Sequence, residues 1–385
     1  MRDRTDLPFS MHEYRARLDR TRALMAERGW TLFVSTTPEN MYYLTGFNSR
    51  GYYSYQCLFI PSTGEPFMVT RHLDAANVEH QTWMERGYDY RDEEDPIELT
   101  VRALHERGLE SAVVGVELSS WFLTATTYLN LRAALPKATF KDGSALIEQL
   151  RMIKSPAEVE YIRRAAQCIS AGMTAAVEAT REGARDQEVA AAGYHARIVA
   201  GSEYVASPMY VQTGPGSAIA HNNWDGRRIE KGDVIFYEMG ASFKRYHAAI
   251  MRTAVIGAPS HEVRRADAAV REGLEASLML MRPGATSGEV DHACREVMIK
   301  RGFEEYHGLR LGYHIGIGYP PTWVGRGTFS LNKDGAEQLA AGMVFHVIPS
   351  LRIPGLGGFG TSETVHVTDQ GPELLTRFES RLFER

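Results

Sequence analysis

Two long helical segments divide the second half of the sequence, and each is followed by a block of glycine-rich, strand-like segments. The helical segments run from Pro156 to Ala200 and from Ser260 to Gly302, and the strand blocks from Tyr210 to Thr253 and from Leu309 to Thr368. Helices and strands that occur in separate blocks are typical of α+β domains, in which helices cover an antiparallel or mixed sheet. The pattern therefore predicts an α+β domain over residues 151–385.

A helix-start signal marks the beginning of this domain. Ser155 stands at the N-cap position, Pro156 suits the first helical position, and Glu158 completes a capping box. Before this point, helical stretches alternate with apolar strand-like runs such as "TLFVST" and "SAVVGVE". Such alternation predicts an α/β fold, and 385 residues suffice for two domains with separate cores. We expect a smaller α/β domain over residues 1–150.

Composition and charge exclude several classes of protein. The chain is 44% hydrophobic and 24% charged, with a formal net charge of −5 and no block of like charge, which argues against a nucleic-acid partner or a membrane surface. The N-terminal stretch lacks the apolar core of a secretory signal, and no apolar run is long enough to span a bilayer. Three widely spaced cysteines, Cys57, Cys168 and Cys294, are typical of reduced, buried thiols. We expect a cytoplasmic protein.

The strand segments of the second domain each present a polar side chain in an otherwise apolar or glycine-rich context. The stretch "FYEMGASFKRYHAAIMRT" predicts two strands joined by a tight, glycine-containing connection, with an acid near the end of the first strand. A lone acid in such a strand is usually satisfied by a partner, so each position has an ordinary structural explanation when taken alone. The candidate positions are His221 in "AHNN", Glu238 in "FYEMG", His314 and Trp323 in "GYHIGIGYPPTW", His346 in "GMVFHVIP", and Glu363 in "SETVHVT".

The order of these motifs resembles the pita-bread family, which includes methionine aminopeptidase, prolidase and creatinase. The resemblance begins at "RMIKSPAEVEYIRRAA" and covers about the last 235 residues, while "TPENMYYLTGF" resembles the N-terminal domain of the creatinase and prolidase branch. It implies a pita-bread catalytic domain preceded by a creatinase-like α/β domain. It also implies a homodimer.

Metallopeptidases of this family bind two metal ions through two aspartates, a histidine and two glutamates. In this chain alanine and isoleucine stand at some of these ligand positions, and their side chains offer no lone pair to a divalent metal. The resemblance therefore predicts a site without a metal and without another cofactor. A single metal held by two carboxylates and one imidazole stays open as an alternative. Position by position, the five ligands fall on Glu238, Ala249, Ile315 (or its neighbour His314), Ile348 and Glu363.

A cationic substrate would resolve the repulsion between two carboxylates left without a metal. An amidinium or guanidinium presents planar N–H donors that pair with a carboxylate. Creatinase, a metal-free relative, hydrolyses a guanidino C–N bond, and "GYPPTW", "FHVIP" and "KRYHAAI" most resemble ectoine hydrolases. Ectoine is a cyclic amidine osmolyte with one carboxylate. The segment "NSRGYYSYQ" departs from that branch, where a Trp- and Phe-rich segment is expected.

The resemblance implies a division of roles among the site residues. Glu238 and Glu363 bind the amidinium, water or one of these carboxylates attacks the amidine carbon, and His221 passes a proton to the departing nitrogen. Ring opening gives N-acetyl-diaminobutyrate, on which a downstream deacetylase would act. Further contacts are a cation–π wall and an arginine for the substrate carboxylate, Arg326 or Arg50. The expected substrate-binding residues are Tyr52, His314, Trp323, Arg326 and His346.

Other functions remain open at this point. They are a creatinase-like amidinohydrolase, a metal-dependent prolidase-like dipeptidase or osmolyte lyase, and a binding protein without catalysis. Metal analysis separates the metal-dependent enzymes from the rest, and turnover of candidate osmolytes separates an enzyme from a binding protein.

Overall fold

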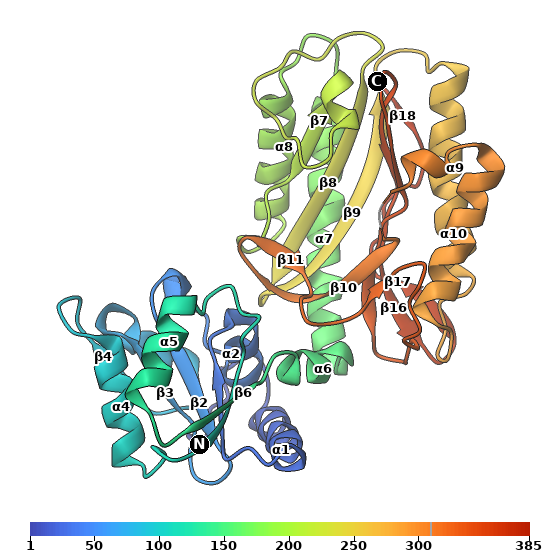
Figure 1. The fold of residues 1–385 in the computed structure, drawn as a ribbon. Coiled ribbons are helices and arrows are strands. Elements are labelled where there is room, and N and C mark those ends of the chain that lie inside the picture. Colours follow the sequence, from blue (N-terminus) through green and yellow to red (C-terminus); the bar gives the residue numbers. More distant parts are fainter. Residues whose placement is uncertain (309) are drawn as a thin grey trace. The chain divides into compact units, whose positions relative to one another are not determined.

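The computed structural model describes residues 1–308 and 310–385, which form two compact units, Met1–Arg151 and Met152–Arg385 (Figure 1). Among the described helices, none combines the length and the apolar character needed to cross a membrane. The expected strand block from Leu309 begins outside the described residues, and its first described strand starts at Gly312.

The first unit contains a six-stranded mixed sheet in the order β4-β3-β2-β1-β5-β6. Strand β1 is buried along its whole length because it lies inside the sheet, antiparallel to β2 and parallel to β5. The α/β expectation for this part of the chain is confirmed. The strands are β1 (Leu32–Ser35), β2 (Cys57–Pro61), β3 (Phe67–Arg71), β4 (Tyr88–Tyr90), β5 (Val113–Val116) and β6 (Thr139–Asp142), and the helices are α1 (Met11–Glu27), α2 (Pro38–Thr45), α3 (Ala75–Gln81), α4 (Pro96–Glu106), α5 (Ala125–Ala134) and α6 (Leu146–Met152).

The second unit is built on a ten-stranded sheet whose main path is β17-β16-β13-β10-β9-β8-β7. All pairings along this path are antiparallel, while β11 and β12 add to β10, and β18 lies parallel to β9. The strands are β7 (Tyr210–Thr213), β8 (Val234–Phe243), β9 (Tyr246–Val255), β10 (Gly312–Tyr319), β11 (Thr322–Val324), β12 (Ser330–Leu331), β13 (Val344–Val347), β16 (Glu363–Thr368), β17 (Gly371–Leu374) and β18 (Phe383–Glu384), with β14 (Ser350–Ile353) and β15 (Gly357–Gly360) in a separate pair.

Four long helices cover this sheet in two pairs, which confirms the α+β prediction. Helix α7 (Pro156–Ala179) packs across β8 and β9 with α8 (Asp186–Val199) beside it, and α9 (His261–Leu278) packs with α10 (Ser287–Arg301) near β14 and β15 (Figure 1). Helix α7 begins as predicted, because Ser155 and Glu158 form both bonds of the capping box.

The long hairpin β8–β9 carries the central part of the site, but its turn differs from the sequence prediction. Gly240 lies inside β8, and the turn is made by Lys244 and Arg245, both with left-handed backbone (φ 47° and 62°). A two-residue hairpin turn favours this backbone, although it strains residues other than glycine. Carboxylate oxygens of Glu203 accept both turn N–H groups, and the Arg245 guanidinium donates to the carbonyls of Tyr204 and Gly318 (2.6 Å each), which holds the turn in place.

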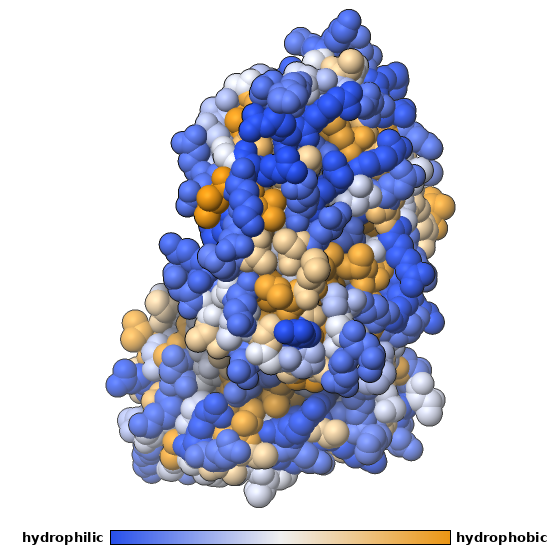
Figure 2. Space-filling model, turned by 90° about the vertical axis from the view of Figure 1, so that its right-hand side faces the viewer, coloured by the Kyte–Doolittle hydropathy of each residue, from blue (hydrophilic) through white to orange (hydrophobic). Residues whose placement is uncertain are grey.

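Hydrophilic residues predominate on the molecular face drawn in Figure 2, and apolar residues lie between them in small groups. Exposed large apolar side chains such as Leu73, Leu129 and Met279 belong to separate elements of both units. Scattered apolar residues of this kind are normal on a protein surface.

Candidate active site

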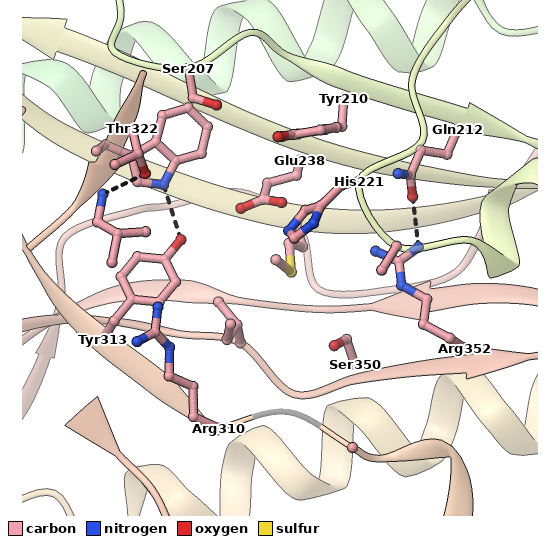
Figure 3. Close-up of a pocket in the computed structure, with 16 residues that line it drawn as sticks. Ser207, Tyr210, Gln212, His221, Glu238, Arg310, Tyr313, Thr322, Ser350 and Arg352 are labelled. Carbon is pink, nitrogen blue, oxygen red and sulfur yellow. Dashed lines mark hydrogen bonds between the residues drawn. The ribbon is translucent and has the colours of Figure 1, made fainter. Parts of the chain in front are cut away.

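A cavity of about 500 Å³ lies within the second unit, and Glu238 faces it from the middle of β8 (Figure 3). His221 and Trp323, two other predicted site residues, line the same cavity. The complete lining is Ser207, Tyr210, Gln212, Ala220, His221, Glu238, Met251, Gly308, Arg310, Tyr313, Thr322, Trp323, Val324, Ile348, Ser350 and Arg352.

Glu238 is half-buried, and its surroundings place its ionisation near neutral pH. Burial raises the pKa of this carboxyl to about 7, while the positive charge of Arg352 and a hydrogen bond from Tyr313 oppose the shift. A carboxyl that changes its charge near neutrality in a cavity is suited to act as a general acid or base.

Tyr313 connects the cavity to a buried set of polar side chains behind it. The Trp323 indole Nε1–H donates to the Tyr313 hydroxyl (3.0 Å), which lies 2.8 Å from Nδ1 of His346. The His346 Nε2 atom is 2.7 Å from Oγ of Ser362. Burial, reinforced by the charge of Arg252, lowers the pKa of His346 to about 3, so its imidazole is neutral. His346 is absent from the cavity lining and lies behind it, in contact with the lining residue Tyr313.

Two arginines give the cavity a cationic side. Arg352 donates from Nη1 to the Gln212 Oε1 atom (2.6 Å) and to the carbonyl of Ser217 (2.5 Å). Burial lowers the pKa of Arg352 to about 10, which leaves it charged at neutral pH. The Arg310 guanidinium lies 5.0 Å from the ring centroid of Tyr313. Sequence reasoning missed both; a charged residue inside the apolar run "IPSLRIP" was the available signal for Arg352.

His221 lies at the exposed rim of the cavity, 6.5 Å from Tyr210 between ring centroids. Tyr210 pairs with Glu238 across β7 and β8, which brings the loop carrying His221 toward the carboxyl. The backbone of His221 is left-handed (φ 60°), a conformation that is uncommon outside glycine and that gathers at functional sites.

Glu363 requires a correction, because the structure directs its side chain away from the cavity. Its Oε1 accepts from Arg252 Nη2 (2.6 Å), its Oε2 accepts from the Thr376 hydroxyl, and both members of the ion pair are almost fully buried. The preceding residue, Ser362, instead contacts His346, since successive residues of an extended chain face opposite sides. Among the described lining residues, Glu238 is therefore the single carboxylate.

Two other predicted contacts, His314 and Arg326, are not among the lining residues, and a third, Tyr52, belongs to the first unit. His314 is buried on the face of β10 opposite Tyr313, where its Nε2 contacts Lys154 Nζ. Tyr52 belongs to the first unit, where its ring meets Phe122 edge-on at 5.3 Å. Arg326 lies in the loop after β11 and is absent from the lining residues, whereas Arg310 and Arg352 are among them.

The donor atoms present do not suit the two-metal site of the metallopeptidases. Ala249 pairs with Gly240 across the hairpin, and its backbone N–H donates to the Thr364 hydroxyl (2.9 Å). Ile348 reaches the cavity with an apolar side chain. Within residues 1–308 and 310–385, no three His, Cys, Asp or Glu side chains are grouped so that they could hold a metal ion. A stable site needs several such donors.

Known proteins resemble this chain over nearly its full length. The model of metallopeptidase family M24 matches residues 160–369, and that of the creatinase/prolidase N-terminal domain matches residues 17–153. The chain is 33% identical over 395 residues to the ectoine hydrolase of Halomonas elongata, with 98% of each chain covered. It is 25% identical to the solved prolidase of Thermococcus sibiricus (TM-score 0.88; 98% of this chain and 100% of that chain covered). It is 26% identical to the solved dipeptidase PepE of Mycobacterium ulcerans, with a TM-score of 0.84 and with 98% of this chain and 99% of that chain covered.

These matches confirm the predicted pita-bread domain and the creatinase-like domain that precedes it. The chain belongs to metallopeptidase family M24 and is a two-domain hydrolase of that family.

Proposed function

We propose that this protein hydrolyses a C–N bond of a small zwitterionic amidine without a metal ion, and that ectoine is its substrate. The observation that carries the proposal is the charge pattern of the cavity, in which Glu238 shares an aromatic-walled space with Arg310 and Arg352. A carboxylate pairs with the N–H donors of an amidinium, and a guanidinium pairs with the carboxylate of the same substrate. The 33% identity to an ectoine hydrolase supports this substrate class.

The reaction can be written with the residues of the cavity alone. Ionised Glu238 holds the amidinium and takes a proton from the attacking water as its oxygen bonds to the amidine carbon. The C–N bond then breaks, and His221 passes protons to the departing nitrogen. Both protons of the water end on that nitrogen, which leaves as an ammonium group, while the carbon keeps the oxygen as an acetamide carbonyl. Such a product would next be consumed by a deacetylase.

A metal-dependent dipeptidase, the activity named for several structural relatives, is less compatible with the residues present. Alanine at position 249 and isoleucine at position 348 supply no ligands, and Glu363 is engaged by Arg252. Metal independence therefore forms part of the proposal.

A substrate panel tests the proposal. Ectoine, 5-hydroxyectoine, creatine and a prolyl dipeptide are each incubated with the purified protein and followed by proton NMR. We expect a new acetamide methyl signal with ectoine. Cleavage of the dipeptide with all three amidine and guanidine compounds left intact would overturn the proposal.

The pH dependence of kcat/KM should follow the ionisation of Glu238. Its pKa is raised to about 7, so the carboxylate is present above that pH and becomes neutral as the pH falls through it. Because the neutral acid cannot pair with an amidinium, kcat/KM should fall by about tenfold per pH unit on the acid side. The acid limb of the kcat profile, which reports the enzyme–substrate complex, should lie at lower pH than that of kcat/KM. The reason is that the bound cation stabilises the Glu238 carboxylate. A kcat/KM profile that is flat through neutrality would contradict this assignment.

Replacing Arg352 with methionine should weaken substrate binding. Loss of a charge-assisted contact to the substrate carboxylate should raise KM by about tenfold to a hundredfold with a smaller change in kcat. The matched control is Arg326→Met, which changes an arginine outside the cavity lining and should leave KM unaltered. Acetamidine, which lacks the carboxylate, should bind the wild type and Arg352→Met equally; a selective loss of acetamidine binding would show that Arg352 serves only to shape the cavity.

A further inference from the structure

A continuous row of polar side chains runs from the cavity into the core behind it, and the reaction outlined above leaves most of it without a role. Glu238 from β8 is followed by Tyr313 from β10, His346 from β13 and Ser362 immediately before β16. Figure 3 shows the Tyr313 hydroxyl directed toward the Glu238 carboxyl. Tyr313, His346 and Ser362 are all at least nine-tenths buried.

Two N–H groups, which can donate a hydrogen bond but cannot accept one, determine the hydrogen-bond pattern of this row. The Met251 backbone N–H donates to the Ser362 Oγ atom (2.6 Å), and the Trp323 indole N–H donates to the Tyr313 hydroxyl oxygen (3.0 Å). Neither N–H group can accept, so each hydroxyl oxygen has one lone pair already used. The remaining question is on which ring nitrogen His346 carries its proton.

Only one of the two His346 tautomers gives every hydroxyl proton an acceptor. If Nδ1 carries the proton, Ser362 donates to Nε2, Nδ1–H donates to the Tyr313 oxygen, and the Tyr313 proton is left for Glu238. If Nε2 carries the proton, it donates to Ser362, whose own hydroxyl proton then has no second contact among the described residues. A buried donor without an acceptor is costly. The Nδ1–H tautomer therefore satisfies the row.

We propose that Tyr313 is a further functional side chain of the site, a hydrogen-bond donor aimed at Glu238, and that His346 and Ser362 are positioning residues that keep its proton on that side. Two N–H groups fill the lone pairs of the Tyr313 oxygen, so its proton can only point outward. The Tyr313 hydroxyl then donates to one acceptor position of the Glu238 carboxylate. The other acceptor positions stay available for the substrate and water. The role of Tyr313 in catalysis rests on the proposed function. The hydrogen-bond geometry of the row is independent of that function.

The charges around the row are consistent with this assignment. Burial and the nearby Glu238 raise the pKa of Tyr313 well above its usual value, which keeps the phenol protonated as a donor. Arg252 faces His346 from β9 and opposes its protonation. Glu238 itself is faced by Tyr210 from β7, Tyr313 from β10, His221 from the loop after β7, and the two arginines, Arg310 before β10 and Arg352 from β14.

The tautomer of His346 is measured by two-bond proton–nitrogen NMR on the full chain labelled at histidine. We expect the Nδ1–H pattern for His346. His247 supplies an internal reference for that pattern, because its Nε2 accepts from the Ala206 N–H and its Nδ1 lies 3.0 Å from the Arg245 carbonyl oxygen. An Nε2–H pattern for His346 would overturn the proposal.

A second measurement follows the Glu238 carboxyl by carbon NMR during a pH titration of the ligand-free protein. Tyr313→Phe removes the donor, so the midpoint should move to higher pH; the same direction, with a smaller shift, is expected for His346→Leu. The titration is repeated with His221→Asn, so that the midpoint is assigned to Glu238 and not to the imidazole at the rim. An unchanged midpoint in Tyr313→Phe would refute the proposed donor even if amidine turnover is found. Conversely, a shifted midpoint without amidine turnover would refute the proposed function alone.

Discussion

Replacing Glu238 with glutamine should lower kcat/KM for the amidine substrate by about 10³-fold or more while the protein stays folded. Glutamine has nearly the same shape, but it cannot balance the amidinium charge or take a proton from water. The burial that raises the pKa of this carboxyl already favours its neutral form, so the neutral amide costs less to desolvate there than the carboxylate does. Steady-state turnover by NMR and thermal unfolding of the same preparation provide the two measurements.

The matched control for this prediction is Glu363→Gln, which makes the same chemical change on strand β16 of the same sheet. Glu363 contacts Arg252 and Thr376 instead of the cavity, so its conservative replacement should leave kcat/KM per folded molecule within a few-fold of the wild type. Equal losses of turnover in the two variants would show that both carboxylates take part in the chemistry.

Replacing Glu363 with alanine should lower the free energy of unfolding of the second unit by about 3–5 kcal/mol. The Arg252 guanidinium, whose side chain is 1% exposed, would lose its counter-charge and keep only carbonyl partners. Removing one member of a buried ion pair leaves an uncompensated charge, which costs more than the pair itself contributes. Denaturant unfolding measures the change.

A double replacement separates this electrostatic effect from simple loss of packing. Arg252→Met combined with Glu363→Met removes both charges and should recover most of the stability that Glu363→Ala loses. If Glu363→Ala unfolds at the wild-type denaturant concentration but has lost turnover, Glu363 belongs to the chemistry after all.

Features with a local cause were predictable from the sequence. The start of α7 follows from the capping box at Ser155 and Glu158, and helical periodicity with blockwise strands was enough to predict the α+β domain. Glu238 and His221 were predicted because both lie in motifs whose order along the chain resembles a known family, and both line the same cavity.

Two of the predicted site residues that do not line the cavity, Glu363 and His314, share one physical cause, which is strand register. Sequence reasoning chose Glu363 and His314, whereas of their neighbours Tyr313 lines the cavity and Ser362 contacts His346 behind it. A shift of one residue in an extended chain moves every side chain to the other face. The register of β16 is determined by its pairing with β13, where Val347 lies opposite Glu363, and such a long-range pairing leaves no local signal. Arg352 was missed for a related reason, because β14 is oriented by its partner β15.

Metal content and turnover measured on one sample test the central claim most directly. The protein is dialysed against a chelator, its zinc, manganese, iron and cobalt are determined by elemental analysis, and its hydrolysis of ectoine is followed by NMR before and after dialysis. We predict unchanged turnover at substoichiometric metal, because Glu238, Tyr313 and the two arginines supply the site's charges and donors. Loss of turnover on dialysis, with recovery on adding back one of these metals, would contradict metal-independent hydrolysis.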